Sequence, residues 1–288
     1  MFNGMLTGII QRVGNANGVA ASSHCTVQLP LGLSYEWCKL VLTGTAFAIA
    51  DMTNIKLKLN GQTLQDYRTG TELEVLNSQQ DRDYTTTAAF VQFDFRRMGC
   101  KPNQRGTFDR DMTMIRTGVP NNPSDPNRQG FKDVSTFTIE FDIGAGATAP
   151  VLNVYASMLD PAAMGLVRYV RDQDYTPAAT GTYEIFDVPR QMIIERIGYN
   201  ITSGVFTELQ NKINGNVVFE GPLAIHNQEQ GNGVRKVITN WFFIEPDPNG
   251  DGQDWIDARA ASDFRQVLTV STAAVIKTVI QYIGPLGA

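Results

Sequence analysis

Short runs in which hydrophobic and polar residues alternate recur along the chain, and turn signals separate them. Residues 55–59 are the clearest case, since two lysines separate three apolar residues. Such a period of two predicts a β-strand with one buried face. The run ends at Asn60-Gly61, a pair typical of tight hairpins because both central residues of a type I′ turn need a positive φ. We predict further strands at residues 25–29, 37–42, 89–95, 137–143 and 151–155.

The second half of the chain repeats the order of these signals. Pro189, Asn214 and Tyr282 correspond to Pro30, Asn60 and Tyr155, at offsets of 159, 154 and 127 residues. Ordered matches with shrinking offsets indicate one fold used twice, with shorter loops in the second copy. Helical patterns are confined to residues 71–80, 222–230 and 252–261, which argues against βαβ units. We therefore predict an all-β protein of two tandem eight-stranded antiparallel jelly rolls with a few short loop helices.

This repeat divides the chain into four segments. We predict an N-terminal arm at residues 1–22, a first jelly roll at 23–157, a linker at 158–181 and a second jelly roll at 182–288. The linker carries a basic and aromatic patch that comprises Arg168, Tyr169 and Arg171. Long polar stretches between residues 99 and 132 are expected to contact partners, because such loops in compact domains are usually functional.

The N-terminal arm is rich in Gly, Asn, Ala and Ser. Its apolar anchors, the candidate interface residues, are Phe2, Met5, Ile9 and Ile10. These anchors gain little by packing locally, so we expect the arm to dock on a neighbour or a membrane-bound partner. Deleting residues 1–18 should then leave the fold intact and prevent assembly.

Composition narrows the function further. Of 288 residues only 18% are charged, below the roughly 25% of an average globular chain, which suggests that assembly covers part of the surface. The net charge of −5 argues against broad nucleic-acid binding through phosphate neutralisation. We expect neither a membrane span nor a signal peptide. The three cysteines lack CxxC spacing and are interpreted as buried free thiols of a reducing cytoplasm.

Catalytic chemistry finds little support in the sequence. The two histidines are His24 and His226. His24 and Cys25 are a poor catalytic dyad, because adjacent residues of a strand point to opposite faces. The common hydrolase, metalloprotease and nucleotide-binding motifs are missing. Acidic pairs such as Asp172 and Asp174 are interpreted as solvated loop charges. We predict that the chain is not an enzyme.

One acidic loop resembles the start of a calcium-binding loop. Its candidate ligands for a divalent cation are Asp247, Asn249 and Asp251, with Asp254 as a further candidate. This order follows the first positions of an EF-hand loop, but the twelfth position, which should be acidic, is Ala258. The segment is therefore either a weak calcium site or a plain turn between a strand and a short helix.

Several stretches together resemble the major capsid proteins of tailless icosahedral bacteriophages with an internal membrane, most closely those of corticoviruses. They are residues 24–36, 54–64 with 67–69, 138–143, 150–152, 182–190 and 282–284. The similarity lies in their order and spacing, and residues 99–132 depart most from the family pattern.

The resemblance implies two jelly rolls side by side, with three chains in a pseudo-hexameric capsomer around an internal membrane. It implies a protein of the virion capsid that is made in the host cytoplasm. The chain would form a homotrimer. Its further partners would be neighbouring capsomers and other virion proteins, such as penton and membrane-associated minor proteins. Sequence-specific nucleic-acid binding is not expected. Calcium stabilises some such shells, which favours calcium as a possible cofactor.

A tandem β-sandwich that binds or cleaves glycans is the alternative from another class, because lectins and glycan-active sandwiches share the fold class. Such modules present exposed aromatic residues with acids on one loop face. The three tryptophans, Trp37, Trp241 and Trp255, are instead scattered, and two lie in strand-like stretches. A stable trimer in solution would favour the capsid protein, and a glycan-binding monomer the alternative.

Overall fold

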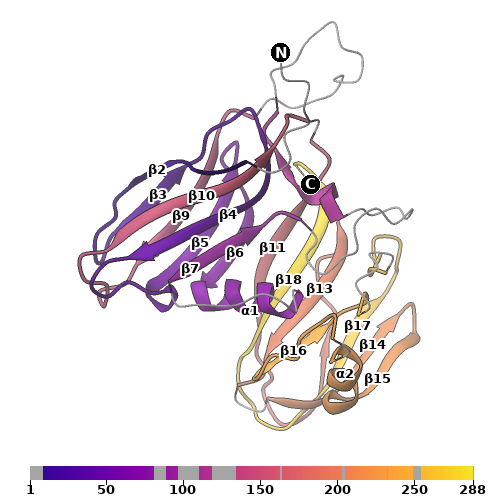
Figure 1. Ribbon diagram of the computed structural model, residues 1–288. Coiled ribbons are helices and arrows are strands. Elements are labelled where there is room, and N and C mark those ends of the chain that lie inside the picture. The colour runs from indigo at the N-terminus through magenta and orange to yellow at the C-terminus, as the bar shows by residue number, and fades with distance from the viewer. Residues whose placement is uncertain are drawn as a thin grey trace, which may run out of the picture.

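Two β-sandwiches lie side by side in the computed structural model of the protein, one from each half of the chain (Figure 1). The structure describes residues 9–80, 89–96, 110–118, 134–162, 164–202, 205–231, 233–248 and 254–287. No helix among these residues is long and apolar enough to cross a membrane.

The first sandwich packs two antiparallel sheets against each other. One sheet contains, in order, β1 (Ile9–Arg12), β10 (Val151–Leu159), β4 (Ser34–Thr43) and β7 (Phe90–Asp94), and β8 (Ile115–Arg116) also pairs with β4. The other contains β6 (Gln62–Thr69), β5 (Met52–Leu59), β9 (Phe137–Ile143), β3 (His24–Gln28) and β2 (Asn15–Asn17). Its loops hold α1 (Gly70–Gln80) and two 3-10 turns, η1 (Ile49–Asp51) and η2 (Arg110–Thr113).

The second sandwich repeats this arrangement strand for strand. Its sheets are β11 (Leu166–Tyr175), β18 (Ile276–Pro285), β13 (Ile193–Asn200) and β16 (Trp241–Ile244), and β12 (Gly181–Ile185), β17 (Phe264–Val270), β14 (Phe206–Ile213) and β15 (Asn216–Pro222). A helix, α2 (Leu223–Gln230), follows β15 just as α1 follows β6. Without the extra strands β2 and β8, each sandwich has the eight strands of a jelly roll, which confirms the predicted double jelly roll.

The two asparagine-glycine turns confirm the repeat in detail. Asn60 and Asn214 have φ angles of 52° and 50°, as a type I′ turn requires. The Asn60 side-chain oxygen accepts hydrogen bonds from the backbone N–H groups of Ser135 and Thr136. The Asn214 oxygen accepts the same bonds from Ser262 and Asp263. In both copies, therefore, the hairpin turn fixes the start of the strand that follows in the sheet.

A β-bulge with a glutamate is a second feature that the two copies share. In β4, Trp37 pairs with Ser157 and Tyr35 pairs with Met158, so that Glu36 between them is the extra residue of the bulge. Glu195 is the extra residue of β13, at the same point of its pairing with β18. This register makes Tyr282 the counterpart of Met158, so the sequence match of Tyr282 with Tyr155 was wrong by three residues. The misalignment arose because both strands carry a tyrosine near this point.

Both segments that were predicted to lie outside the jelly rolls contain a strand. Residues 9–12 of the predicted arm form β1, which pairs with β10. Residues 166–175 of the predicted linker form β11, which pairs with β18 along its whole length. The arm and linker boundaries were therefore wrong at these residues. The pattern was misleading because β1 is an exposed edge strand, whereas β11 contains a buried charged residue, Arg168, so neither shows simple alternation.

Of the three predicted helices, two are present as α1 and α2. The described part of the third, residues 254–261, is not helical. Ile256 instead forms two backbone hydrogen bonds with Ile194 of β13, both 3.0 Å long. This bridge uses the N–H and C=O groups that a helix would need.

The described cysteines are buried free thiols, as predicted. Cys25 and Cys38 are completely buried in the core of the first sandwich. Burial raises the pKa of Cys25 to about 11 and also raises that of Cys38, so both thiols stay protonated and unreactive near neutral pH. Cys100 lies outside the described residues.

Candidate functional site at the junction of the two sandwiches

The two sandwiches share one continuous sheet. β6 of the first sandwich lies parallel to β11 of the second, with Gln65 opposite Val170. This contact joins four strands of the second sandwich to five of the first in a nine-stranded sheet. Both Gln65 and Val170 are buried. The junction is therefore part of the folded core rather than a flexible linker.

Arginines of the second sandwich bind the end of α1. The Arg196 guanidinium donates to the backbone oxygen of Leu76 at 2.7 Å and to the side-chain oxygen of Gln79. Its third contact is the Gln281 side chain, at 2.7 Å. The last carbonyl groups of a helix have no partner within the helix and carry a partial negative charge. Arg196 therefore binds the last turn of α1, near its negative end, across the junction, although burial lowers its pKa to about 9.

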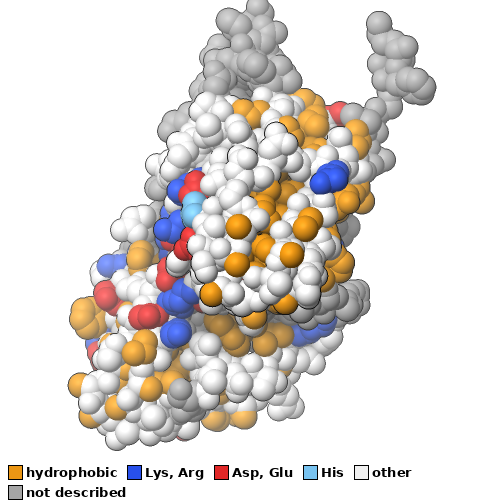
Figure 2. All heavy atoms as spheres, turned by 90° about the vertical axis from the view of Figure 1, so that its left-hand side faces the viewer, with side chains coloured by type: hydrophobic (Ala, Val, Ile, Leu, Met, Phe, Trp, Pro, Cys, Tyr) orange, Lys and Arg blue, Asp and Glu red, His pale blue; other side chains and the backbone are white. Residues whose placement is uncertain are grey.

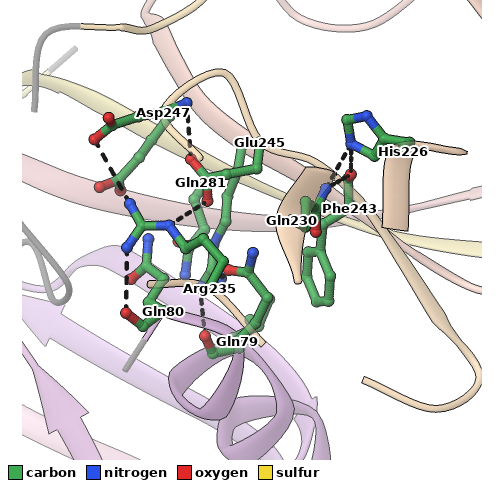
Figure 3. Close-up of polar contacts among 12 residues, drawn as sticks. Gln79, Gln80, His226, Gln230, Arg235, Phe243, Glu245, Asp247 and Gln281 are labelled. Atoms are coloured by element: carbon green, nitrogen blue, oxygen red, sulfur yellow. Dashed lines mark hydrogen bonds and ion pairs between the residues drawn. The ribbon is translucent and has the colours of Figure 1, made fainter. Parts of the chain in front are cut away.

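Arg235 reaches the same helix end from the loop after α2. Its guanidinium donates to the backbone oxygen of Gln80 at 3.2 Å. On its other side lie the carboxylates of Glu245 at 3.5 Å and Asp247 at 3.6 Å (Figure 3). All three charged side chains are only 1% exposed. Burial raises the pKa of Glu245, against the opposing effect of Arg235.

A buried ion pair holds the centre of the junction. Two nitrogens of Arg168, on β11, donate to the two carboxylate oxygens of Glu195, at 2.7 and 3.0 Å. A third nitrogen donates to the backbone oxygen of Asp94, on β7 of the first sandwich. This paired geometry is the strongest arrangement that arginine forms with a carboxylate. One side chain thus connects two strands of the second sandwich to one of the first.

The solvent edge of the junction carries a further arginine set. Arg68, on β6, forms ion pairs with Asp172 at 3.0 Å and Asp174 at 2.5 Å, both on β11. Arg171 donates in the other direction, to the backbone oxygens of Leu64 and Thr63 at 2.9 and 3.0 Å. Asp172 and Asp174 are solvent-exposed, as predicted, but they lie on a strand and not in a loop. They face a partner in the other sandwich.

Glu72 makes the stability of this edge depend on pH. The Glu72 side chain is buried, which raises its pKa from 4.5 to about 7, against the effect of Arg68 at 3.3 Å. An acid whose pKa is raised by folding binds its proton more tightly when folded, so its contribution to stability is lost as pH rises through that pKa. The free energy of unfolding of wild type, relative to that of Glu72→Gln, should therefore decrease as the pH rises from 4.5 to about 7. Urea unfolding of both proteins across this range measures it, and a constant difference would contradict the assignment.

The histidines occupy structural positions. His24 is exposed and contacts Asp142 at 2.7 Å, while Cys25 points into the core, which confirms that the two residues face opposite sides. His226 donates to the backbone oxygen of Phe243 at 2.5 Å (Figure 3), and burial lowers its pKa. Trp241 is buried and Trp37 and Trp255 are half-buried, so these residues form no exposed aromatic cluster.

The candidate cation loop is only partly described. Asn249 and Asp251 lie outside the described residues, and Asp254 is exposed. Asp247 belongs to the junction, where it faces Arg235. Within the described residues, no group of three or more His, Cys, Asp or Glu side chains could hold a metal ion. Calcium binding by this loop stays a prediction.

The candidate interface residues divide in the same way. Phe2 and Met5 lie outside the described residues. Ile9 is half-buried in β1, whereas the neighbouring Ile10 is 65% exposed. Figure 2 shows hydrophobic side chains gathered on the face of the first sandwich that is turned toward the viewer, with charged side chains in a band beside them. On the same sheet, Lys39 lies over the rings of Trp37 and Phe90 at 5.5 and 5.6 Å.

Comparisons with known proteins match both sandwiches. The family model of the viral coat protein P2 N-terminal domain matches residues 10–159, and that of the C-terminal domain matches residues 167–286. These limits include most of β1 and β11, which the sequence pattern had placed in the arm and the linker.

Individual relatives are similar in sequence or in fold. The major capsid protein P2 of Pseudoalteromonas phage PM2 is 28% identical over 185 residues, which span 64% of this chain and 60% of that protein. The crystal structure of the major capsid protein P2 from bacteriophage PM2 superposes with a TM-score of 0.82, at 22% identity, over 96% of this chain and 97% of the other. A chain of the Sulfolobus Turreted Icosahedral Virus structure gives 0.66 at 12% identity, over 97% and 91%.

The two family matches cover both sandwiches in their order along the chain, and the similar structures share the double jelly roll. This chain therefore belongs to the family of viral coat protein P2, of which it contains the N-terminal and the C-terminal domain.

Proposed function

We propose that this chain is the major capsid protein of a tailless icosahedral bacteriophage, and that three copies form a pseudo-hexameric capsomer. The observation that carries this proposal is that one fold occurs twice in the chain, with both copies fixed to each other by a buried junction. Each chain thus contributes two similar lobes, and three chains give six. Six similar lobes in a ring approximate a hexagonal tile, which packs into a flat lattice. The relationship to the P2 coat proteins supports this function.

The proposed shell surrounds an internal membrane. The position of the chain in this shell determines its other partners. The partners are neighbouring capsomers and other virion proteins, such as penton and membrane-associated minor proteins. Sequence-specific nucleic-acid binding has no part in this function, in agreement with the net charge of −5. We place the protein in the virion capsid after synthesis in the host cytoplasm. We also propose that calcium stabilises the assembled shell.

Sedimentation of the purified protein tests the trimer. We expect a single species of three times the 31.7 kDa chain mass at micromolar concentration, because exposed apolar residues such as Ile10 and Val218 favour a permanent interface. Native mass spectrometry of the same sample should give the same stoichiometry. A monomer in both measurements would contradict the proposed capsomer.

A further inference from the structure

Each chain contains a second pair of strands equivalent to β6 and β11, but these two strands do not pair with each other within the chain. The repeat makes β15 the counterpart of β6, and β1 the counterpart of β11. Each of these counterpart strands has one hydrogen-bonded neighbour among the described strands, β14 for β15 and β10 for β1. Both are therefore sheet edges. Figure 1 shows β15 on the side of the second sandwich that faces away from the first.

The register of the counterpart of β6 follows from its hairpin. In the first sandwich, Leu57 pairs with Gln65, and a bulge skips Leu64. In the second, Asn211 pairs with Phe219, and the same bulge skips Val218. The offset is 154 residues, as at the asparagine of the turn. Phe219 is therefore the counterpart of Gln65.

The register of the counterpart of β11 follows from the glutamate bulge. Next to this bulge, Ser157 of β10 corresponds to Gln281 of β18. Gln281 pairs with Val170 of β11, and Ser157 pairs with Ile10 of β1. Ile10 is therefore the counterpart of Val170, the residue that lies opposite Gln65 at the junction.

The counterpart positions differ sharply in exposure. At the junction, Val170 and Leu64 are completely buried. Their counterparts are exposed in the single chain, Ile10 by 65% and Val218 by 56%. An edge strand with exposed apolar side chains is a site for pairing with another chain. The two edges thus carry apolar residues at the positions that the junction buries.

We propose that β15 of one copy pairs in parallel with β1 of the next copy, with Phe219 opposite Ile10. The new contact would form between two chains, with the same geometry that the β6–β11 junction has within one chain. This inference rests on the proposed trimeric capsomer. It joins two different surfaces of the chain, so successive copies close into a ring when the rotation permits it. The partner of this edge is therefore a second copy of the chain itself.

Chemical crosslinking tests this register. The double variant Ile10→Cys, Phe219→Cys is treated with a short bismaleimide and run on a denaturing gel. Cys100 is replaced by serine in every variant, and Cys25 and Cys38 are buried. We expect covalent dimers and trimers, because each chain places one cysteine on each side of the interface. Each single-cysteine variant should stay monomeric on the gel, because its one thiol meets no thiol across the interface.

The control pair is Ile10→Cys with Val275→Cys, since Val275 is 45% exposed and lies outside the sheet edges. If wild type is a trimer by sedimentation and the Ile10–Phe219 pair crosslinks no better than this control, the edge pairing is wrong and the capsomer stands. If wild type is a monomer, the capsomer itself is wrong. In addition, Val218→Asp should dissociate the trimer, whereas Val275→Asp should leave it intact.

Discussion

Arg168→Met should lower the free energy of unfolding by about 3–5 kcal/mol, the usual cost of removing one partner of a buried ion pair. Methionine fills a similar volume but leaves the Glu195 carboxylate buried without the guanidinium that binds both of its oxygens. It also removes the donor to the Asp94 backbone oxygen, so the loss includes a contact between the sandwiches. Urea unfolding, followed by tryptophan fluorescence, measures the change.

Two comparisons separate charge from packing. The double variant Arg168→Met, Glu195→Gln should recover much of the loss, because the remaining polar group is neutral. Arg259→Met is the matched control, since Arg259 forms an equally short pair with Asp257 on the exposed surface, where ion pairs add little. If Arg168→Met unfolds at the same urea concentration as Arg259→Met, the buried pair does not hold the junction together.

Deleting residues 1–18 should destabilise the first sandwich, contrary to the prediction made from the sequence. The deletion removes β1 and β2, which pair with β10 and β3. It also removes Val13, a buried residue. Burying such a side chain contributes roughly 1.5–3 kcal/mol to the free energy of unfolding. Lost backbone hydrogen bonds add about 1 kcal/mol each. We expect a melting temperature lower by at least several degrees.

A shorter deletion, of residues 1–8, is the matched control. It keeps β1, β2 and Val13, so the melting temperature should stay within a few degrees of wild type by calorimetry. Because it also removes Phe2 and Met5, any loss of assembly in this variant can be assigned to the arm rather than to unfolding. Equal melting temperatures of the two deletions would show that β1 and β2 contribute nothing to the fold.

The strands that could be predicted from the sequence are those whose hydrophobic pattern and turn residues lie next to each other in the chain. Residues 55–59 alternate and run into Asn60-Gly61, and both features depend only on neighbours in the chain. The strands β1 and β11 were missed because their signal is not local. Arg168 looks like a surface residue until Glu195 and the Asp94 carbonyl are placed beside it, and no pattern within β11 shows those partners.

The junction as a functional site was also missed, although one signal was available. Glu195 and Arg196 are adjacent charged residues inside a run that is otherwise apolar from Ile193 to Ile197. Charged residues in such a run are costly to bury unless they are paired, so the pattern indicates a buried polar contact. The identity of the partners, such as Gln79 of α1, depends on tertiary structure and could not be predicted.

The covalent connection of the two sandwiches changes the entropy of assembly. Six separate lobes would need five association events to form one ring, whereas three chains need two. Each event costs roughly 4–15 kcal/mol in translational and rotational freedom at a standard concentration of 1 M. Within each chain, the β6–β11 contact forms during folding and carries no such cost. In the proposed ring, the contacts between chains therefore offset this cost twice and not five times, so the same contact area between lobes gives a more stable ring.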